Sequence, residues 1–263
     1  MSTLAYALHD SRTMLRRNLR RMSRYPSMTL VLIVIPVIFL LLFVYVFGGT
    51  IGAGIGGAHP GRAAYANYLV PGIVMMSIAS GATGTATSVA MDMTEGIIAR
   101  FKTMAIFRPS VLAGHVVGAV IQTMASLAVV IGVGLLVGFR PNATPLEWLA
   151  AAGVLLAISF SITWLSVAFG LAAKTVEGAS NMPMPLILLP FLGSGFVPTD
   201  SMPTALSWFA AYQPFTPFIE TVRGLLLGTG IGRDGWLAAG WCVGITVLGY
   251  VWARNRYNRD PSS

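Results

Sequence analysis

Six stretches of this 263-residue chain run for about 20 residues or more without Asp, Glu, Lys or Arg. The hydrocarbon core of a bilayer is about 30 Å thick, and a helix needs about 20 apolar residues to cross it. We therefore expect an all-α polytopic membrane protein with six transmembrane helices. The expected spans are residues 28–48, 65–90, 110–138, 148–173, 178–198 and 235–253.

The composition excludes several other classes of protein. Only 10% of the residues are charged, against about 25% in an ordinary soluble domain, so a globular surface could not be covered. Disorder requires low hydrophobicity, whereas 55% of this chain is hydrophobic. A disulfide scaffold is excluded by the single Cys242. The first apolar run is also longer than the core of a secretory signal peptide, which favours an uncleaved anchor.

The net charge of +8 indicates topology rather than nucleic acid binding, and we expect no nucleic acid partner. The chain has only two lysines, and its arginines gather beside apolar runs, where they record orientation and contact anionic lipid head groups. Basic clusters precede the first span and follow the last one. Positive segments stay in the cytoplasm, so both termini are expected there and the number of crossings is even.

Residues 203–228 do not fit a simple crossing. They are apolar on average but contain Pro203, Pro214, Pro217, Glu220 and Arg223. Proline interrupts helices and a charge near the bilayer centre is costly, so we expect an external re-entrant or interfacial helical hairpin. Glu220 and Arg223 lie three residues apart and share a helical face, which favours a structural ion pair over a substrate contact.

Two segments on the cytoplasmic side have amphipathic patterns. In residues 5–25 the arginines occupy one half of a helical wheel and apolar residues the other, as in an interfacial helix, although a simple positive tether fits equally. In residues 92–107 an apolar helical stripe includes Ile97, Phe101 and Met104. That short helix could dock in a groove of a partner protein or pack against its own bundle.

Several catalytic motifs are missing from the sequence. There is no H-E-x-x-H, no metal-ligand spacing among the three histidines, and His115 is expected to be a lone interfacial or packed histidine. The six expected spans contain no acidic residue, which counts against an ion-coupled carrier. Ala173 replaces the glycine that a phosphate-binding loop needs before Lys174-Thr175. This chain is therefore not expected to be an enzyme, and any ATP hydrolysis would occur on another polypeptide.

Small residues are abundant in the apolar stretches. Pairs at G-x-x-x-G spacing occur at Gly114 and Gly118 and again at Gly134 and Gly138, and the second span contains Gly81. Small residues let helices approach closely in lipid. Tight packing within the bundle is the favoured interpretation, with dimerisation through these faces as the alternative.

Several motifs, in this order and spacing, resemble the permease subunit of ABC-2 type exporters, in particular the daunorubicin/doxorubicin-resistance type. The resemblance covers nearly the whole chain. Its motifs include YANYLVPG at 65–72, EGIIARFK at 95–102, GFVPTDSMP at 195–203, QPFTP at 213–217 and ETVRGLLLG at 220–228.

The resemblance implies a single transmembrane domain over residues 1–263 that works as a dimer, with two copies of a separate ATP-binding subunit. ATP and Mg would be bound by that partner, and this chain would carry no cofactor or metal. Residues 92–107 would be the coupling helix that sits in the ATPase groove. The implied coupling residues are Asp92, Glu95, Gly96, Ile97, Arg100, Phe101, Lys102 and Met104.

In the same family, spans one, two and five line the path between subunits. The candidates here for contacting an apolar substrate are Met75, Met76, Phe191 and Phe196, with bundle core as the alternative interpretation. We expect ATP-driven export of a hydrophobic or amphipathic drug, antibiotic or lipid across a bacterial cell membrane, and a polysaccharide fits less well. The alternative function is a non-transporting scaffold or immunity subunit that anchors a partner ATPase.

Overall fold

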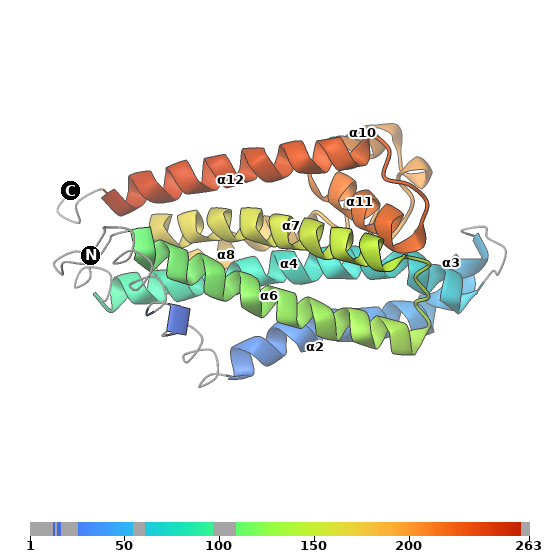
Figure 1. Cartoon of the computed structure of the whole chain (residues 1–263), viewed down its shortest axis with the longest axis horizontal. Coiled ribbons are helices and arrows are strands. Elements are labelled where there is room, and N and C mark those ends of the chain that lie inside the picture. The colour runs from blue at the N-terminus through green and yellow to red at the C-terminus, as the bar shows by residue number, and fades with distance from the viewer. Residues whose placement is uncertain (1–12, 14, 17–25, 55–60, 97–108, 259–263) are drawn as a thin grey trace.

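The computed structural model describes residues 13, 15–16, 26–54, 61–96 and 109–258. Over these ranges the chain forms helices joined by turns, with no strand, as expected for an all-α protein. Five of these helices are long and apolar enough to cross a membrane. They lie side by side as an elongated bundle (Figure 1).

Five of the six expected spans fall within the long helices. The first comprises α2 (Pro26–Leu42), a π-helical turn η1 (Phe43–Phe47) and α3 (Gly48–Gly54). The next three are α4 (Arg62–Thr94), α6 (Pro109–Val137) and α7 (Pro145–Ala172), and the last is α12 (Asp234–Asn258). Most of the interfacial helix expected at 5–25 lies outside the described residues.

The start of α7 shows why the helices begin where they do. The backbone N–H of Glu147 donates to the Thr144 hydroxyl, and the Thr144 N–H donates to a Glu147 carboxylate oxygen at 2.6 Å. Pro145 occupies the first helical position, where a missing N–H costs nothing. This capping box satisfies two backbone donors that would otherwise be left at the end of a spanning helix.

Helix α4 forms the centre of the bundle. It packs against α2, α6 and α7, and also against the shorter helices α8, α9 and α11. Its apolar side chains are almost all buried, whereas α2 and α12 expose many large apolar side chains. A helix that is apolar on every face is stable inside a bundle, and apolar residues on an outer face suit contact with lipid.

Small residues set how closely the helices approach. A Cβ atom on Gly249 of α12 would lie 2.6 Å from the Leu165 backbone nitrogen of α7. On the α4–α6 contact, a Cβ on Gly81 would lie 3.0 Å from Thr123 and one on Gly134 3.1 Å from Val70. Gly81 and Gly134 therefore serve packing inside the bundle, the interpretation that the sequence favoured.

The expectation of a continuous fifth span at 178–198 is wrong. The chain there forms two short helices, α8 (Val176–Asn181) and α9 (Met184–Leu188), followed by turns to residue 198. Three prolines remove backbone donors between residues 183 and 190, and they cannot be accommodated by one straight helix. The sequence predicted a bend from Pro183, Pro185 and Pro190, but the helix is interrupted completely. We call residues 176–198 the broken segment.

The broken segment still runs along the bundle. It leaves the end of α7, packs against α4 through α8 and α9, and brings Gly195 against Gly72 near the start of α4. It therefore returns the chain to the opposite end of the bundle, where α10 (Thr204–Tyr212) and α11 (Phe215–Leu227) lie toward the same end as α3 (Figure 1). The ends of α4, α7 and α12 and the start of α6 lie together at the other end (Figure 1).

The second span is longer than expected. Helix α4 continues to Thr94, so Asp92 is a buried helical residue and not the first residue of a coupling loop. The expected span at 65–90 contains no acidic residue, and Asp92 lies just beyond it in the same helix. Of the coupling helix expected at 92–107, the structure describes residues 92–96 only.

Candidate functional site

The ends of α4 and α6 are joined by a buried polar pair. His115 Nε2 lies 3.1 Å from Asp92 Oδ2, and the two side chains are 3% and 1% exposed. These residues flank the segment that connects the two helices. His115 is thus not the lone histidine that the sequence suggested. The pair fixes the two helices to each other at the base of the expected coupling segment.

Glu95 and Gly96 mark the point where α4 stops. The N–H of Glu95 donates to the Met91 carbonyl at 2.9 Å, and that of Gly96 to the Met93 carbonyl at 3.1 Å. Gly96 has a φ of 69°, a conformation that glycine adopts without steric cost. The Glu95 side chain is exposed. The other proposed coupling residues lie outside the described residues, namely Ile97, Arg100, Phe101, Lys102 and Met104.

The residues expected in a hairpin do form two short helices. Pro203 directly precedes α10, and Pro214 directly precedes α11, where each proline's fixed φ suits a helix start. Pro217 lies buried in the first turn of α11. Nearly every residue of α11 is buried against α4, α7 and α12, so this helix is part of the bundle and not a surface loop.

Arg223 forms the ion pair with Glu220 that their spacing predicted. Its Nη2 also donates to the Tyr68 carbonyl at 3.0 Å and to the Ser194 carbonyl at 2.8 Å. The guanidinium lies over the Tyr68 ring, 4.0 Å from its centroid. One buried side chain therefore joins α4, the broken segment and α11.

Gln213 provides a second connection that the sequence did not reveal. Its Nε2 donates to the Leu189 carbonyl at 3.2 Å and to the Thr216 hydroxyl at 3.1 Å. Its Oε1 accepts from the N–H of Phe215 at 3.0 Å, at the start of α11. Because Leu189 lies where α9 ends, this buried amide replaces backbone hydrogen bonds that the interrupted helix cannot make.

The four candidate substrate contacts fall into two groups. Met75 and Met76 are 0% and 1% exposed within the core of α4, so they line no open surface in this structure. Phe191 and Phe196 stack with ring centroids 4.2 Å apart, and they contact Phe39 and Phe43 of the first span. We call Phe39, Phe43, Phe191 and Phe196 the aromatic cluster. It connects the broken segment to the π-helical turn η1, a type of distortion frequent at functional sites.

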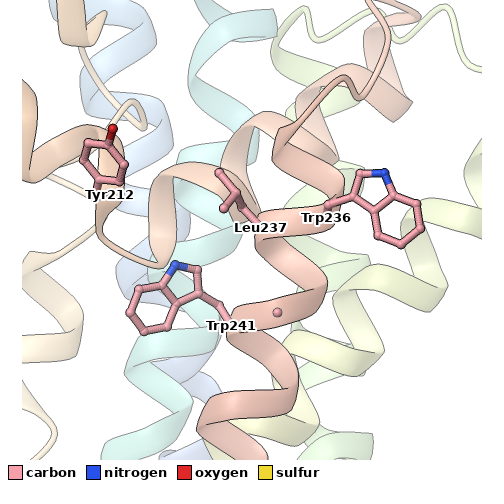
Figure 2. A pocket seen from close by; sticks show the side chains of 5 residues that line it. Tyr212, Trp236, Leu237 and Trp241 are labelled. Carbon is pink, nitrogen blue, oxygen red and sulfur yellow. The ribbon is translucent and has the colours of Figure 1, made fainter.

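An open pocket of about 410 Å³ lies between α10 and α12. It is lined by Tyr212, Trp236, Leu237, Gly240 and Trp241, and Figure 2 shows Tyr212 and Trp241 on the same side of α12. Trp236 is 83% exposed. Aromatic side chains that combine an apolar ring with a polar atom gather where a bilayer meets water. Trp236 and Trp241 near the start of the last span are the residues from which the sequence could have predicted aromatic side chains at such a boundary, although this boundary was not among the expectations from the sequence.

A second groove, of about 340 Å³, lies between α6 and α7 and is also lined by Leu226 of α11. Its lining is apolar and includes Gly132, Ala152 and Trp148. Among the described residues, no group of three His, Cys, Asp or Glu side chains could hold a metal ion. The polar chemistry described here comes from the Asp92–His115 pair and from the surroundings of Arg223.

A bundle of long apolar helices, with one interrupted segment held by buried polar side chains, defines a polytopic helical membrane protein. The chain belongs to the ABC-2 type transporter family, whose domain it matches over residues 10–227. That match includes the helices α2 to α11 and ends before α12.

Two curated relatives are similar over much of the chain. A daunorubicin resistance ABC transporter permease of Streptomyces coeruleorubidus is 29% identical over 245 residues, which is 92% of this chain and 81% of the relative. A probable doxorubicin resistance ABC transporter permease of Mycobacterium tuberculosis is 26% identical over 183 residues, or 68% of this chain. This chain covers 65% of that second relative.

Proposed function

We propose that this protein is the membrane-spanning subunit of an ATP-driven exporter for hydrophobic or amphipathic compounds. The observation that carries the proposal is the family match over residues 10–227, together with two relatives that are named drug-resistance permeases. The long apolar helices agree with a protein that crosses the membrane several times. On this proposal the protein resides in a bacterial cell membrane, with its termini in the cytoplasm.

The energy source in this proposal is a separate ATP-binding subunit. ATP and Mg would be held by that partner, because residues around Lys174 and Thr175 lack the glycine of a phosphate-binding loop. Two copies of this chain would associate with two copies of the ATPase. The exposed Glu95 and the residues that follow it would contact the partner at the end of α4.

The path for the compound would run beside the broken segment. Interrupted helices are tolerated at membrane depth where the freed backbone is satisfied by neighbours or lines a cavity, and they recur at transport sites. The aromatic cluster presents large apolar rings to this segment. Movement of Phe191 and Phe196 away from Phe39 and Phe43 would open an apolar surface between the first and fifth crossings.

The test is reconstitution of the chain with its ATP-binding partner in proteoliposomes. We expect ATP-dependent movement of daunorubicin across the membrane, and we expect Glu95→Ala to reduce that movement at least tenfold while the purified protein remains folded. The matched control is Glu177→Ala, another exposed carboxylate that lies beyond the end of α7.

Absence of ATP-dependent movement for every amphipathic compound tried would overturn the proposal. Binding of the ATPase without any movement would instead favour the scaffold or immunity subunit. Normal export by Glu95→Ala would show that the end of α4 does not couple the two subunits.

A further inference from the structure

Five residues around the guanidinium of Arg223 form a buried polar cluster. They are Tyr65 and Tyr68 on α4, Ser194 in the broken segment, and Glu220 and Arg223 on α11. We call them the Arg223 cluster. Three separately folded elements meet here, close to the end of the bundle that carries α3 and α10 (Figure 1).

The guanidinium of Arg223 has N–H groups that are not used in hydrogen bonds to the described residues. An arginine carries five N–H groups and no acceptor. Here Nη2 uses its two hydrogens on the carbonyls of Tyr68 and Ser194, and Nη1 donates to Glu220. The Nε atom is buried and has no hydrogen-bond partner. The Nε–H and one N–H of Nη1 therefore remain available.

Three hydroxyls of the same cluster lack a well-formed hydrogen bond. Among the described residues, no partner meets hydrogen-bond geometry for the buried Tyr65 Oη, Tyr68 Oη or Ser194 Oγ. Tyr68 interacts with Arg223, Glu220 and Tyr65, and its contact with Arg223 has hydrogen-bond character without full hydrogen-bond geometry. These polar groups therefore lie in one neighbourhood. A buried polar atom without a partner is costly, so these groups favour a molecule that can accept hydrogen bonds from them.

The cluster has one edge that is open to its surroundings. The Glu220 side chain is 31% exposed, whereas that of Arg223 is 10% exposed. A molecule that approaches from the Glu220 side would meet the free donors of Arg223 first. The Tyr68 ring, which lies against the guanidinium, would give the bound molecule an apolar surface to contact.

We propose that the Arg223 cluster binds a hydrogen-bond-accepting oxygen, carbonyl or phosphoryl, of an amphipathic molecule. The unpartnered groups can all donate hydrogen bonds, and one acceptor oxygen has two lone pairs, so it can pair with two of them, such as the Nε–H of Arg223 and a nearby hydroxyl. No second buried acid is needed, because Glu220 already balances the charge of Arg223. The oxygen belongs either to the exported compound or to a phospholipid head group. The assignment to exported compounds rests on the proposed function.

The test removes hydroxyls without disturbing the Arg223 contacts. Tyr65→Phe, Tyr68→Phe and Ser194→Ala keep the rings and the backbone carbonyls that Arg223 uses. The matched control is Ser77→Ala, because Ser77 is a buried residue of α4 whose hydroxyl also lacks a partner but lies outside the cluster. Binding is measured on the purified chain by ligand-induced thermal stabilisation, with daunorubicin and a short-chain phosphatidylglycerol as the two probes.

We expect at least one probe to stabilise the unmodified protein, and we expect the triple variant to bind that probe at least tenfold more weakly. Stabilisation by daunorubicin assigns the oxygen to the exported compound, and stabilisation by phosphatidylglycerol alone assigns it to lipid. Without ligand, the triple variant should be as stable as the unmodified protein or more stable, because it has lost donors that had no partner. Ser77→Ala should bind like the unmodified protein.

Unchanged binding of both probes by the triple variant would overturn the proposal and leave only buried water at the cluster. Failure of both probes to stabilise the unmodified protein would overturn it as well. Because binding is measured without ATP or the partner subunit, these outcomes are separate from a failure of ATP-driven export.

Discussion

Asp92 and His115 show how two residues 23 positions apart define one end of the bundle. Burying an ionisable pair is expensive, and the cost is recovered only when each group keeps its partner. The pair therefore constrains the end of α4 relative to the start of α6. The sequence did not predict it, because α4 continues past the expected end of the second span at residue 90 and carries Asp92 within it, to Thr94. Periodicity alone cannot place a helix end.

At the residue scale, we expect Asp92→Ala to destabilise the protein by about 2 kcal/mol or more, since His115 would be left buried beside a cavity. His115→Ala should be destabilising for the same reason. The measurement is thermal or denaturant unfolding of the purified chain in detergent.

The double variant Asp92→Ala, His115→Ala tests whether the two residues interact energetically. We expect it to cost less than the sum of the two single variants, with a coupling energy on the order of 0.5–3 kcal/mol. Strict additivity would contradict a stabilising pair. Ser80→Ala, at a half-buried position on the same helix, is the comparison for losing a small polar side chain.

Of the contacts that Arg223 makes, local sequence spacing predicts one and cannot predict the others. The three-residue interval between Glu220 and Arg223 predicted an ion pair, and the structure contains it. The carbonyls of Tyr68 and Ser194 could not be predicted, because they lie 155 and 29 positions away and meet Arg223 only after the helices pack. Tertiary partners of this kind leave no periodic signal in one sequence.

At the scale of elements, the broken segment departs most from the expected fold. Its lack of charge predicted a span, and its prolines predicted a bend. The complete break depends on side chains elsewhere, because Gln213 donates to the Leu189 carbonyl and Arg223 donates to the Ser194 carbonyl. Without those partners, an interrupted helix among apolar neighbours would carry unsatisfied backbone groups.

A substitution in α4 tests the close approach of the broken segment. A Cβ atom on Gly72 would lie 2.3 Å from the Gly195 carbonyl oxygen. We expect Gly72→Ala to lower stability by about 2 kcal/mol, since backbone atoms of two elements must separate. Unfolding of the purified protein measures the effect.

Gly84→Ala is the matched control on the same helix, because its Cβ would meet nothing within 4 Å. That variant should be neutral or up to about 1 kcal/mol more stable, as alanine favours helix over glycine. Equal effects of the two substitutions would contradict the packing of Gly195 on Gly72.

At the scale of the whole molecule, five long helices alone would place the ends of α2 and α12 on opposite sides. The broken segment supplies the additional passage, so the described chain returns to the end from which α2 departs (Figure 1). The basic clusters at both ends of the sequence predict an even number of crossings, and this stays a prediction beside the five helices that are long and apolar enough to span a membrane. The sequence did not predict that residues 178–198 lack a continuous helix.

Side-specific labelling of engineered cysteines checks this passage. In a Cys242→Ser background, which removes the single native thiol, Lys174→Cys and Ser201→Cys flank the broken segment at exposed positions. We expect a membrane-impermeant maleimide to label them from opposite sides of intact cells or inverted vesicles. Labelling of both from one side would contradict a crossing.

Two further positions serve as references for the side of the membrane in the labelling experiment. Glu95→Cys lies at the end of α4 and should share the side of Lys174→Cys. Asn142→Cys lies in the turn between α6 and α7 and should share the side of Ser201→Cys, because the Asn142 N–H donates to the Leu226 carbonyl of α11.

The broken segment also divides the amide protons of the bundle into two populations. In the long helices each N–H is held by a carbonyl one turn away, and exchange with deuterium requires a full turn to open. In residues 189–198 the carbonyls of Leu189 and Ser194 accept from the side chains of Gln213 and Arg223, and the Ser194 N–H donates to the Thr216 hydroxyl. Local opening there needs only rotamer changes. Deuterium should therefore exchange into the amides of residues 189–198 before it exchanges into the amides of the long helices.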